Sequence, residues 1–209
     1  MARESAHEKT LRLIETEVPL WEEGRTVAGI DEVGRGPLAG PVMACCIIIP
    51  REKLVDGVDD SKKLSEKKRE ELYRLLLENA DYVRVATLEP EEIDRVNILQ
   101  ATKICMEACA KDAKGAFFLI DAVTGLHLPG ESRSIAHGDA LSYSIAAASI
   151  VAKVARDDIM RKIDALYPEY GFAKNKGYGT REHIEAIRKY GITPIHRKSF
   201  LGGICPELL

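Results

Sequence analysis

The sequence has no apolar segment long enough to cross a membrane. Its longest apolar run, VMACCIII at residues 42–49, is far shorter than the roughly 20 residues that span a bilayer. The charged N-terminus, MARESAHEKTLRLIETEV, has no apolar core of the kind that secretion signals carry. Internal repeats and low-complexity segments are also missing. We therefore expect a soluble, cytoplasmic protein.

Paired metal ligands of the cysteine and histidine type are missing as well. The five cysteines are scattered, and none forms the C-x-x-C pair of a structural zinc site. We expect them to be buried, reduced thiols of an intracellular protein. The five histidines form no cluster at metal-ligand spacing, and we do not expect His137 to be a ligand although it lies close to an aspartate.

The chain has little net charge, but its charge is unevenly distributed. The net charge of −3 argues against a generally basic nucleic-acid binder. Residues 153–199 contain 11 lysines and arginines against six acids, whereas residues 1–152 contain 19 against 26. This asymmetry fits a polyanion held beside an acidic, metal-binding centre. An ordinary solvated surface is the alternative, and charge alone does not exclude it.

Apolar periodicity predicts an α/β protein in which the strands are short and most helices are amphipathic. Ser65 and Thr180 are expected to cap two of the helices, and Gly191 to end the second of these. The strands are expected at residues 26–31, 41–50, 82–88 and 116–121, with a brief one in 132–140, and the helices at 4–17, 65–80, 98–113, 142–168 and 180–191.

The order of these elements predicts a mixed sheet with helices on both faces and a helical C-terminal extension. The first three strands are expected to pair antiparallel around the strand 41–50. A helical crossover should then place the strand 116–121 parallel to the strand 26–31. Asp31 and Asp121 would lie at the same edge of the sheet, where open α/β sheets commonly have their sites.

Four acidic residues stand out by position: Asp31 and Glu32 at one strand end, Asp121 at another, and Asp139 before a helix. Four carboxylates in one pocket cannot all remain charged without cations, and oxygen ligands alone suit Mg²⁺ or Mn²⁺. Solvated loop acids and helix caps are the alternatives, and capping is the favoured interpretation of Asp139 taken alone. Strand alternation would send Asp31 and Glu32 to opposite faces, so their convergence is not settled by the sequence.

A glycine turn, Gly34-Arg35-Gly36, follows the first two acids at once. Glycine permits backbone conformations that other residues resist and allows close approach of a ligand to the peptide. Exposed amides there could bind phosphate, and Arg35 could add positive charge. Taken alone, however, most G-x-G turns only reverse the chain.

Basic and aromatic residues lie further along the chain. Lys62 is in a loop before a helix, whereas Ser149, Lys153 and Arg156 share one helix face among small alanines. Such a face could approach either the sheet or a nucleic-acid backbone, and a surface pair of Lys153 with Asp157 is an equal alternative. Tyr178, between two glycines, could stack on a sugar or base, or could instead anchor a loop on the core.

Taken together, these segments resemble bacterial ribonuclease HII over most of the chain, from about residue 27 to 200. The resemblance is carried by AGIDEVGRGPLAGPV, DSKKLSEKKREELY, EEIDRVNILQAT, GDALSYSIAAASIVAKVARD, YPEYGFAKNKGYGT and HRKSF, in that order. It implies an RNase H-like mixed β-sheet flanked by helices with a C-terminal helical extension. The expected division is an N-terminal helical segment (1–26), a catalytic core (27–150) and an extension packed on it (151–209).

The resemblance also implies an activity: metal-dependent cleavage of RNA in RNA–DNA hybrids and incision 5′ of single ribonucleotides in duplex DNA, by a monomer that takes part in ribonucleotide excision repair. Two Mn²⁺ or Mg²⁺ ions would be the cofactors. The implied catalytic and metal-binding residues are Asp31, Glu32, Asp121 and Asp139, and the implied substrate-binding residues are Gly34, Arg35, Gly36, Tyr178, Lys153, Arg156, Ser149 and Lys62.

The sequence departs from the family pattern at two places. His137 stands where many members have lysine, and DAVTG follows the strand of Asp121 where many have DGN. Neither change affects an expected ligand. Two other functions stay open on the residues alone: a non-catalytic module that binds hybrids, and a metal-dependent phosphatase of small nucleotides.

Overall fold

A five-stranded mixed sheet forms the centre of the protein, for which a computed structural model describes residues 4–208. The strands lie in the order β3-β2-β1-β4-β5. As predicted, β1 pairs antiparallel with β2 and parallel with β4, and β2 pairs antiparallel with β3. The strands are β1 (Val27–Val33), β2 (Val42–Ile48), β3 (Tyr82–Leu88), β4 (Phe117–Asp121) and β5 (Ser132–Ile135).

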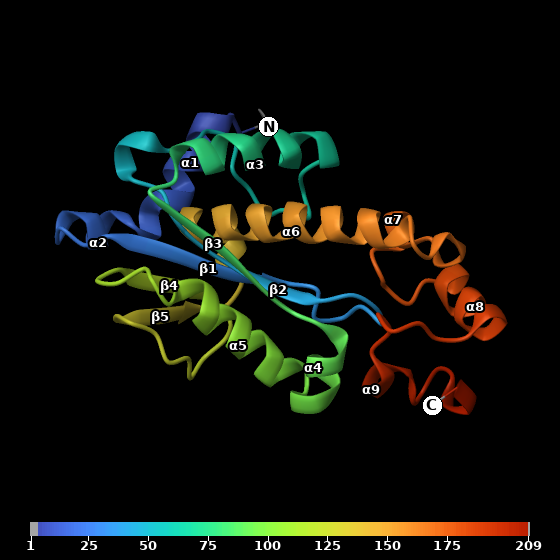
Figure 1. Ribbon diagram of the computed structural model, residues 1–209. Helices are drawn as coiled ribbons and strands as arrows, with labels where there is room; N and C mark the ends of the chain where they lie inside the picture. Colours follow the sequence, from blue (N-terminus) through green and yellow to red (C-terminus); the bar gives the residue numbers. More distant parts are fainter. Residues whose placement is uncertain (1–3, 209) are drawn as a thin grey trace.

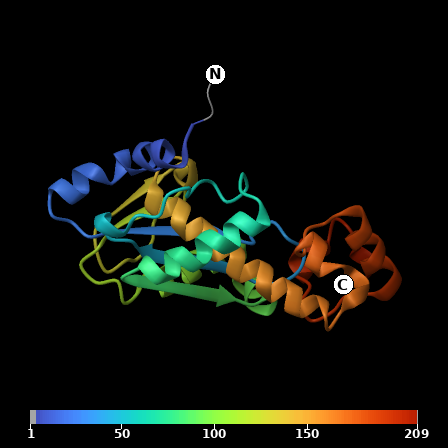
Figure 2. The ribbon, with the colours of Figure 1, turned by 90° about the horizontal axis from the view of Figure 1, so that it is seen from above.

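Helices cover both faces of this sheet, as Figures 1 and 2 show. The long α6 and, beyond it, α3 lie on one face, while α5 packs on β2 and β3 from the other. None of the helices within residues 4–208 combines the length and hydropathy needed to span a bilayer. The helices are α1 (Ala6–Leu13), α2 (Val18–Glu22), α3 (Glu66–Asn79), α4 (Pro90–Val96), α5 (Ile98–Ala110), α6 (Tyr143–Asp164), α7 (Phe172–Asn175), α8 (Arg181–Tyr190) and α9 (Lys198–Leu201).

Small residues let α6 lie directly on β1. A β-carbon at Gly29 of β1 would stand 2.0 Å from the carbonyl oxygen of Ser144, so only glycine fits this crossing. Along the helix, Ala146, Ala147 and Ala148 are fully buried. The small residues thus allow α6 to contact the sheet. Of the two predicted roles for this face, contact with the sheet or with a nucleic-acid backbone, the structure shows the first. This close contact holds the acid-bearing end of β1 beside the middle of α6.

The N-terminal segment is tied to the start of α6 by a buried carboxylate. Glu17 is fully buried, and its Oε1 accepts hydrogen bonds from the Ser142 hydroxyl (2.5 Å) and the Ser144 amide (2.9 Å). Burial raises the pKa of Glu17. Ser142 caps α6 by accepting a hydrogen bond from the Ile145 amide. Asp139 therefore does not cap this helix, because Ser142 does so.

The C-terminal part of the chain lies at the far end of α6 (Figure 2). The predicted boundary at residues 150 and 151 falls inside α6, which runs through both parts. In the C-terminal part, two buried histidines join the loop before α8 to the segment before α9. The Nε2 atoms of His183 and His196 are 3.1 Å apart, and Nδ1 of His183 donates to the carbonyl of Tyr178. Burial and the neighbouring imidazole lower the pKa of His196 to about 4.

The predicted strands and the four later helices are confirmed within a few residues at each end, whereas the helix expected at 4–17 is divided into α1 and the 3₁₀ helix Ile14–Thr16. Ser65 and Thr180 cap α3 and α8, and Gly191 ends α8, as predicted. The short helices α2, α4, α7 and α9 were not predicted. Pro90 begins α4 two residues after β3 ends. No element was expected between residues 88 and 98, because that stretch is too short to show the apolar periodicity of a helix.

Candidate active site

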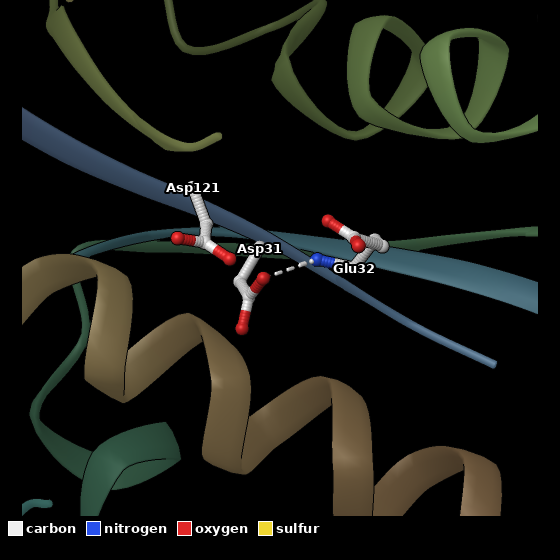
Figure 3. A group of neighbouring side chains, drawn as sticks. All are labelled: Asp31, Glu32 and Asp121. Carbon is white, nitrogen blue, oxygen red and sulfur yellow. Dashed lines mark hydrogen bonds between the residues drawn. The ribbon is translucent and has the colours of Figure 1, made fainter. Parts of the chain in front are cut away.

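Three of the four predicted acids converge at the adjoining ends of β1 and β4. Oxygen atoms of Asp31, Glu32 and Asp121 all lie within 4.8 Å of one another. The parallel register, which pairs Ile30 with Ile120, brings the two aspartates side by side. In Figure 3 the Asp31 side chain extends toward α6, whereas the Glu32 carboxyl group lies on the side of the strand away from that helix. Alternation is therefore kept, and Glu32 reaches the group from the opposite face.

The protein compensates this group of acids only in part. Burial, followed by the charges of Glu32 and Asp121, raises the pKa of Asp31 well above its usual value. Hydrogen bonds from Ser149 and from the Glu32 amide, whose nitrogen lies 2.7 Å from Asp31 Oδ1, act in the opposite direction. Burial also raises the pKa of Glu32 and of Asp121. All three pKa values thus show a site that disfavours negative charge.

The donor set fits a hard divalent cation. Within residues 4–208, Glu32 Oε2 is a buried oxygen without a hydrogen-bond partner, in a group that supplies carboxylate oxygens alone. Buried polar atoms are normally satisfied, and oxygen ligands of this kind suit Mg²⁺ or Mn²⁺. Asp31, Glu32 and Asp121 are therefore the residues that would hold such an ion.

Asp139, the fourth predicted acid, lies next to this group but not within it. It is 7% exposed in the 3₁₀ helix Gly138–Ala140, and Lys62 Nζ stands 3.4 Å from its Oδ2. The preceding amide, of Gly138, donates to Asp121 Oδ1 at 2.7 Å, and the charge of Asp139 contributes to raising the pKa of Asp121. Asp139 thus lies close enough to influence Asp121 and is itself paired with Lys62. His137 is exposed, with a left-handed φ of 56°.

A cleft opens beside the acids and is lined by most of the predicted residues. Ser61, which sequence analysis missed, is buried in its wall, with its hydroxyl 3.0 Å from that of Ser149. Its neighbour Lys62 was predicted as a basic loop residue and, through the resemblance, as a substrate-binding residue, but a buried serine carries no sequence signal of its own. The cleft is lined by Asp31, Glu32, Val33, Ser61, Lys62, Asp121, Ser149, Lys153 and Tyr178.

The glycine turn follows β1 at the mouth of this cleft. Gly34 has φ +88°, and a β-carbon there would stand 2.3 Å from Arg156 Nε, so this position requires glycine. Arg35 and Gly36 are exposed, and Arg35 Nη1 lies 3.5 Å from Glu32 Oε1. Tyr178 is 46% exposed, and its ring would be in contact with a β-carbon at Gly36. Tyr178 is therefore free to contact a ligand and does not anchor a loop in the core.

The helix face of Ser149, Lys153 and Arg156, predicted to be basic, does not present both cations to solvent. Arg156 is fully buried and donates to the carbonyls of Ala39, Pro41 and Lys176, so its guanidinium is not available to a phosphate. The side chain turns inward because the carbonyls of the turn region need donors there. Lys153 forms the predicted pair with Asp157 at 2.6 Å and also lines the cleft.

Comparison with known proteins places the chain in a family. The sequence model of ribonuclease HII matches residues 28–202. The chain is 53% identical over 196 residues to a ribonuclease HII of Desulfitobacterium hafniense, covering 92% of this chain and 75% of that protein. It is 52% identical over 180 residues to that of Clostridioides difficile, covering 85% and 71%. The fold is similar to ribonuclease H2 of Pyrococcus horikoshii OT3, with a TM-score of 0.70 and 28% identity over 83% of this chain and 93% of that one. The chain belongs to the ribonuclease HII family and is a ribonuclease H.

Proposed function

We propose that this ribonuclease, which acts on RNA–DNA hybrids, also incises duplex DNA on the 5′ side of single embedded ribonucleotides. The convergence of Asp31, Glu32 and Asp121 beside a cleft with two lysines is the observation that supports this proposal best. The products would carry 5′-phosphate and 3′-hydroxyl ends. A ribonuclease with this specificity would begin the excision of ribonucleotides from DNA, in the cytoplasm and as a monomer.

The four acids would act by binding two Mn²⁺ or Mg²⁺ ions. Such ions, when bound, lower the pKa of a water that attacks phosphorus and stabilise the departing 3′-oxygen. Asp31, Glu32 and Asp121 are already close enough to share ligation, and Asp139 would join them when substrate draws Lys62 away. The Glu32 amide would hold Asp31 in place, because it donates a hydrogen bond to Asp31 Oδ1, and Ser149 lines the cleft beside it.

The other predicted residues would recognise the substrate. Gly34, Arg35 and Gly36 would approach the 2′-hydroxyl at the RNA-to-DNA junction, and Tyr178 would stack on the sugar from the other side of the turn. Lys62 and Lys153 line the cleft and would neutralise phosphates of the cleaved strand. Because the 2′-hydroxyl is bound by the turn, it would serve recognition and would not act as the nucleophile.

The decisive experiment uses a DNA duplex with one ribonucleotide, with products mapped on both sides of it. Asp31→Asn and Asp139→Asn should each lower kcat by several orders of magnitude in Mg²⁺ or Mn²⁺. Exposed Asp158, which pairs with Lys162 on the same helix as Ser149, offers Asp158→Asn as a control that should cut normally. Cutting by both site variants at the wild-type rate, or products with 2′,3′-cyclic ends, would refute the assignment.

The two alternative functions predict other results. A non-catalytic binding module would bind hybrids without metal and give no product with or without EDTA. A phosphatase of small nucleotides would not need a cleft lysine, so Lys153→Met should leave its rate unchanged. In the proposed nuclease, the same variant should weaken duplex binding and reduce its salt dependence.

A further inference from the structure

Two buried arginines lie directly behind the glycine turn. The side chains of Arg156 and Arg197 are fully buried, and neither forms an ion pair with a carboxylate of residues 4–208. Buried charges are normally paired, because desolvating an unpaired charge is costly. Both guanidinium groups instead donate to backbone carbonyls, and the ring of Phe200 covers the Arg197 guanidinium at 5.2 Å.

Arg197 is the arginine that holds the turn itself. Its Nη2 donates to the carbonyl of Gly34 at 2.6 Å, and its Nη1 donates to that of Arg35 at 3.0 Å. Its Nε and Nη2 also donate to the carbonyl of Gly40, where the chain leaves the turn for β2. A planar guanidinium can make these bonds at once, whereas an ammonium group cannot span them in one plane. Arg156 contacts other carbonyls, those of Ala39, Pro41 and Lys176.

These bonds determine where the amides of the turn point. In a planar trans peptide the carbonyl and the following N–H point in opposite directions. Because the carbonyls of Gly34 and Arg35 point inward at Arg197, the amides of Arg35 and Gly36 point outward. Both residues are exposed, and neither amide has a hydrogen-bond partner within the part of the chain that the structure describes. Two adjacent outward amides form a small site for an oxygen-rich ligand.

We propose that Arg197 is a positioning residue for the substrate, fixing the turn so that the amides of Arg35 and Gly36 donate to oxygens of the ribonucleotide. This inference rests on the proposed function, because it takes the bound ligand to be the strand that carries the ribonucleotide. Arg197 does not touch that strand. It acts through the peptide planes in front of it, and its unpaired charge adds positive potential where the strand's phosphates would lie.

The electrostatics of the pair agree with this role. Burial, and then the charge of Arg156, lower the pKa of Arg197 to about 9, although the charge of Asp94 acts in the opposite direction, so the group is charged at neutral pH without a direct ion pair. Burial also lowers the pKa of Arg156. An anionic ligand at the outer side of the turn would compensate both charges across the peptide planes.

The test compares Arg197→Lys with Arg156→Lys in the full-length protein. Both variants replace a fully buried guanidinium bonded to carbonyls, so both should lower the melting temperature. Only Arg197→Lys releases the carbonyls of Gly34 and Arg35, so it should raise KM for a duplex with one ribonucleotide about tenfold, the loss expected for one charged hydrogen bond. Its kcat should change little. An unchanged KM in Arg197→Lys, or an equal rise in Arg156→Lys, would overturn the inference.

An NMR measurement on the wild-type protein tests whether the amides of Arg35 and Gly36 bind the duplex, even if Arg197→Lys does not fold. The duplex is titrated in Ca²⁺ to slow cleavage. The amide signals of Arg35 and Gly36 should shift and exchange more slowly with solvent, while exposed Gly203 serves as a reference that should not change. Unaffected Arg35 and Gly36 signals alongside normal incision would overturn the inference alone. Failure of the wild-type protein to incise the duplex would overturn the proposed function, and this inference with it.

Discussion

Replacing Asp31 with asparagine should stabilise the metal-free protein while it abolishes cleavage. The oxygens of Asp31, Glu32 and Asp121 lie within 4.8 Å of one another, a distance at which two unit charges repel by about 3 kcal/mol at an effective dielectric constant of 20. Asparagine removes this repulsion and the burial of a charge, yet its oxygen can still accept the Glu32 amide. Because burial and the neighbouring acids disfavour the charged form of Asp31, we expect a gain of about 1–3 kcal/mol at pH 8.

The gain should depend on pH in a defined direction. Burial and the neighbouring acids raise the pKa of Asp31 in the folded protein. Below the unfolded-state pKa, the carboxyl is neutral in both states and carries no penalty. The penalty grows as the pH rises through the higher folded-state pKa. The stability difference between Asp31→Asn and wild type should therefore be greatest at pH 8 and vanish below about pH 3.

Thermal unfolding in EDTA, with and without added Mn²⁺, measures the effect. Without metal, Asp31→Asn should raise the melting temperature by about 2–10 °C, and Mn²⁺ should stabilise the wild type more than the variant. Asp157→Asn is a matched control, because Asp157 is equally buried but pairs with Lys153 at 2.6 Å. That variant should lower the melting temperature. A loss of stability in Asp31→Asn as large as that in Asp157→Asn would show that the acids are compensated within the protein.

Three further predictions concern the turn, the exposed tyrosine and the histidine pair. Gly34→Ala should destabilise the protein by more than about 2 kcal/mol in urea unfolding, since its φ of +88° and the contact with Arg156 exclude a β-carbon. Tyr178→Ala should leave the melting temperature unchanged because the ring is 46% exposed, but should raise KM for the single-ribonucleotide duplex tenfold or more through about 1–3 kcal/mol of lost stacking. Burial lowers the pKa of His196 to about 4, so stability should fall as the pH drops from about 6.5 toward 4. In His196→Asn, which preserves an acceptor for the Thr193 amide, that fall should be smaller.

The frame of the site could be predicted because it depends on local periodicity and on one topological rule. Apolar runs ending in Asp31 and Asp121 indicated two strands, and the intervening helix required them to be parallel. The observed register places Ile30 opposite Ile120, which brings the two acids together. Small residues along α6 likewise indicated a close contact, and Gly29 with the alanines of that helix provides it.

The partners of the turn could not be predicted, because nothing in the sequence marks an arginine as buried. Arg156 and Arg197 lie in a basic segment, where exposure to solvent or nucleic acid is the normal expectation for arginine. Their burial depends on the carbonyls of a turn more than 110 residues away in the sequence. The spacing of the residues correctly placed Arg156 on the same face of α6 as Ser149. It could not show that Arg156 would be buried and would donate to backbone carbonyls.

Charged groups of opposite sign lie close to the end of β1: the acids of the candidate active site, and Arg197 behind the glycine turn. On one side, burial, reinforced by neighbouring carboxylates, raises the pKa values of Asp31, Glu32 and Asp121. On the other, burial and the charge of Arg156 lower the pKa of Arg197. The turn Gly34–Gly36, two of whose carbonyls accept hydrogen bonds from Arg197, follows β1 directly. In the proposed complex, bound metal ions would face the acids, and oxygens of the ribonucleotide would accept hydrogen bonds from the outward amides of Arg35 and Gly36. Metal binding and ribonucleotide recognition would then be coupled through the end of β1. A change in the conformation of the turn Gly34–Gly36 would displace both the acids that bind metal and the amides that bind the ribonucleotide.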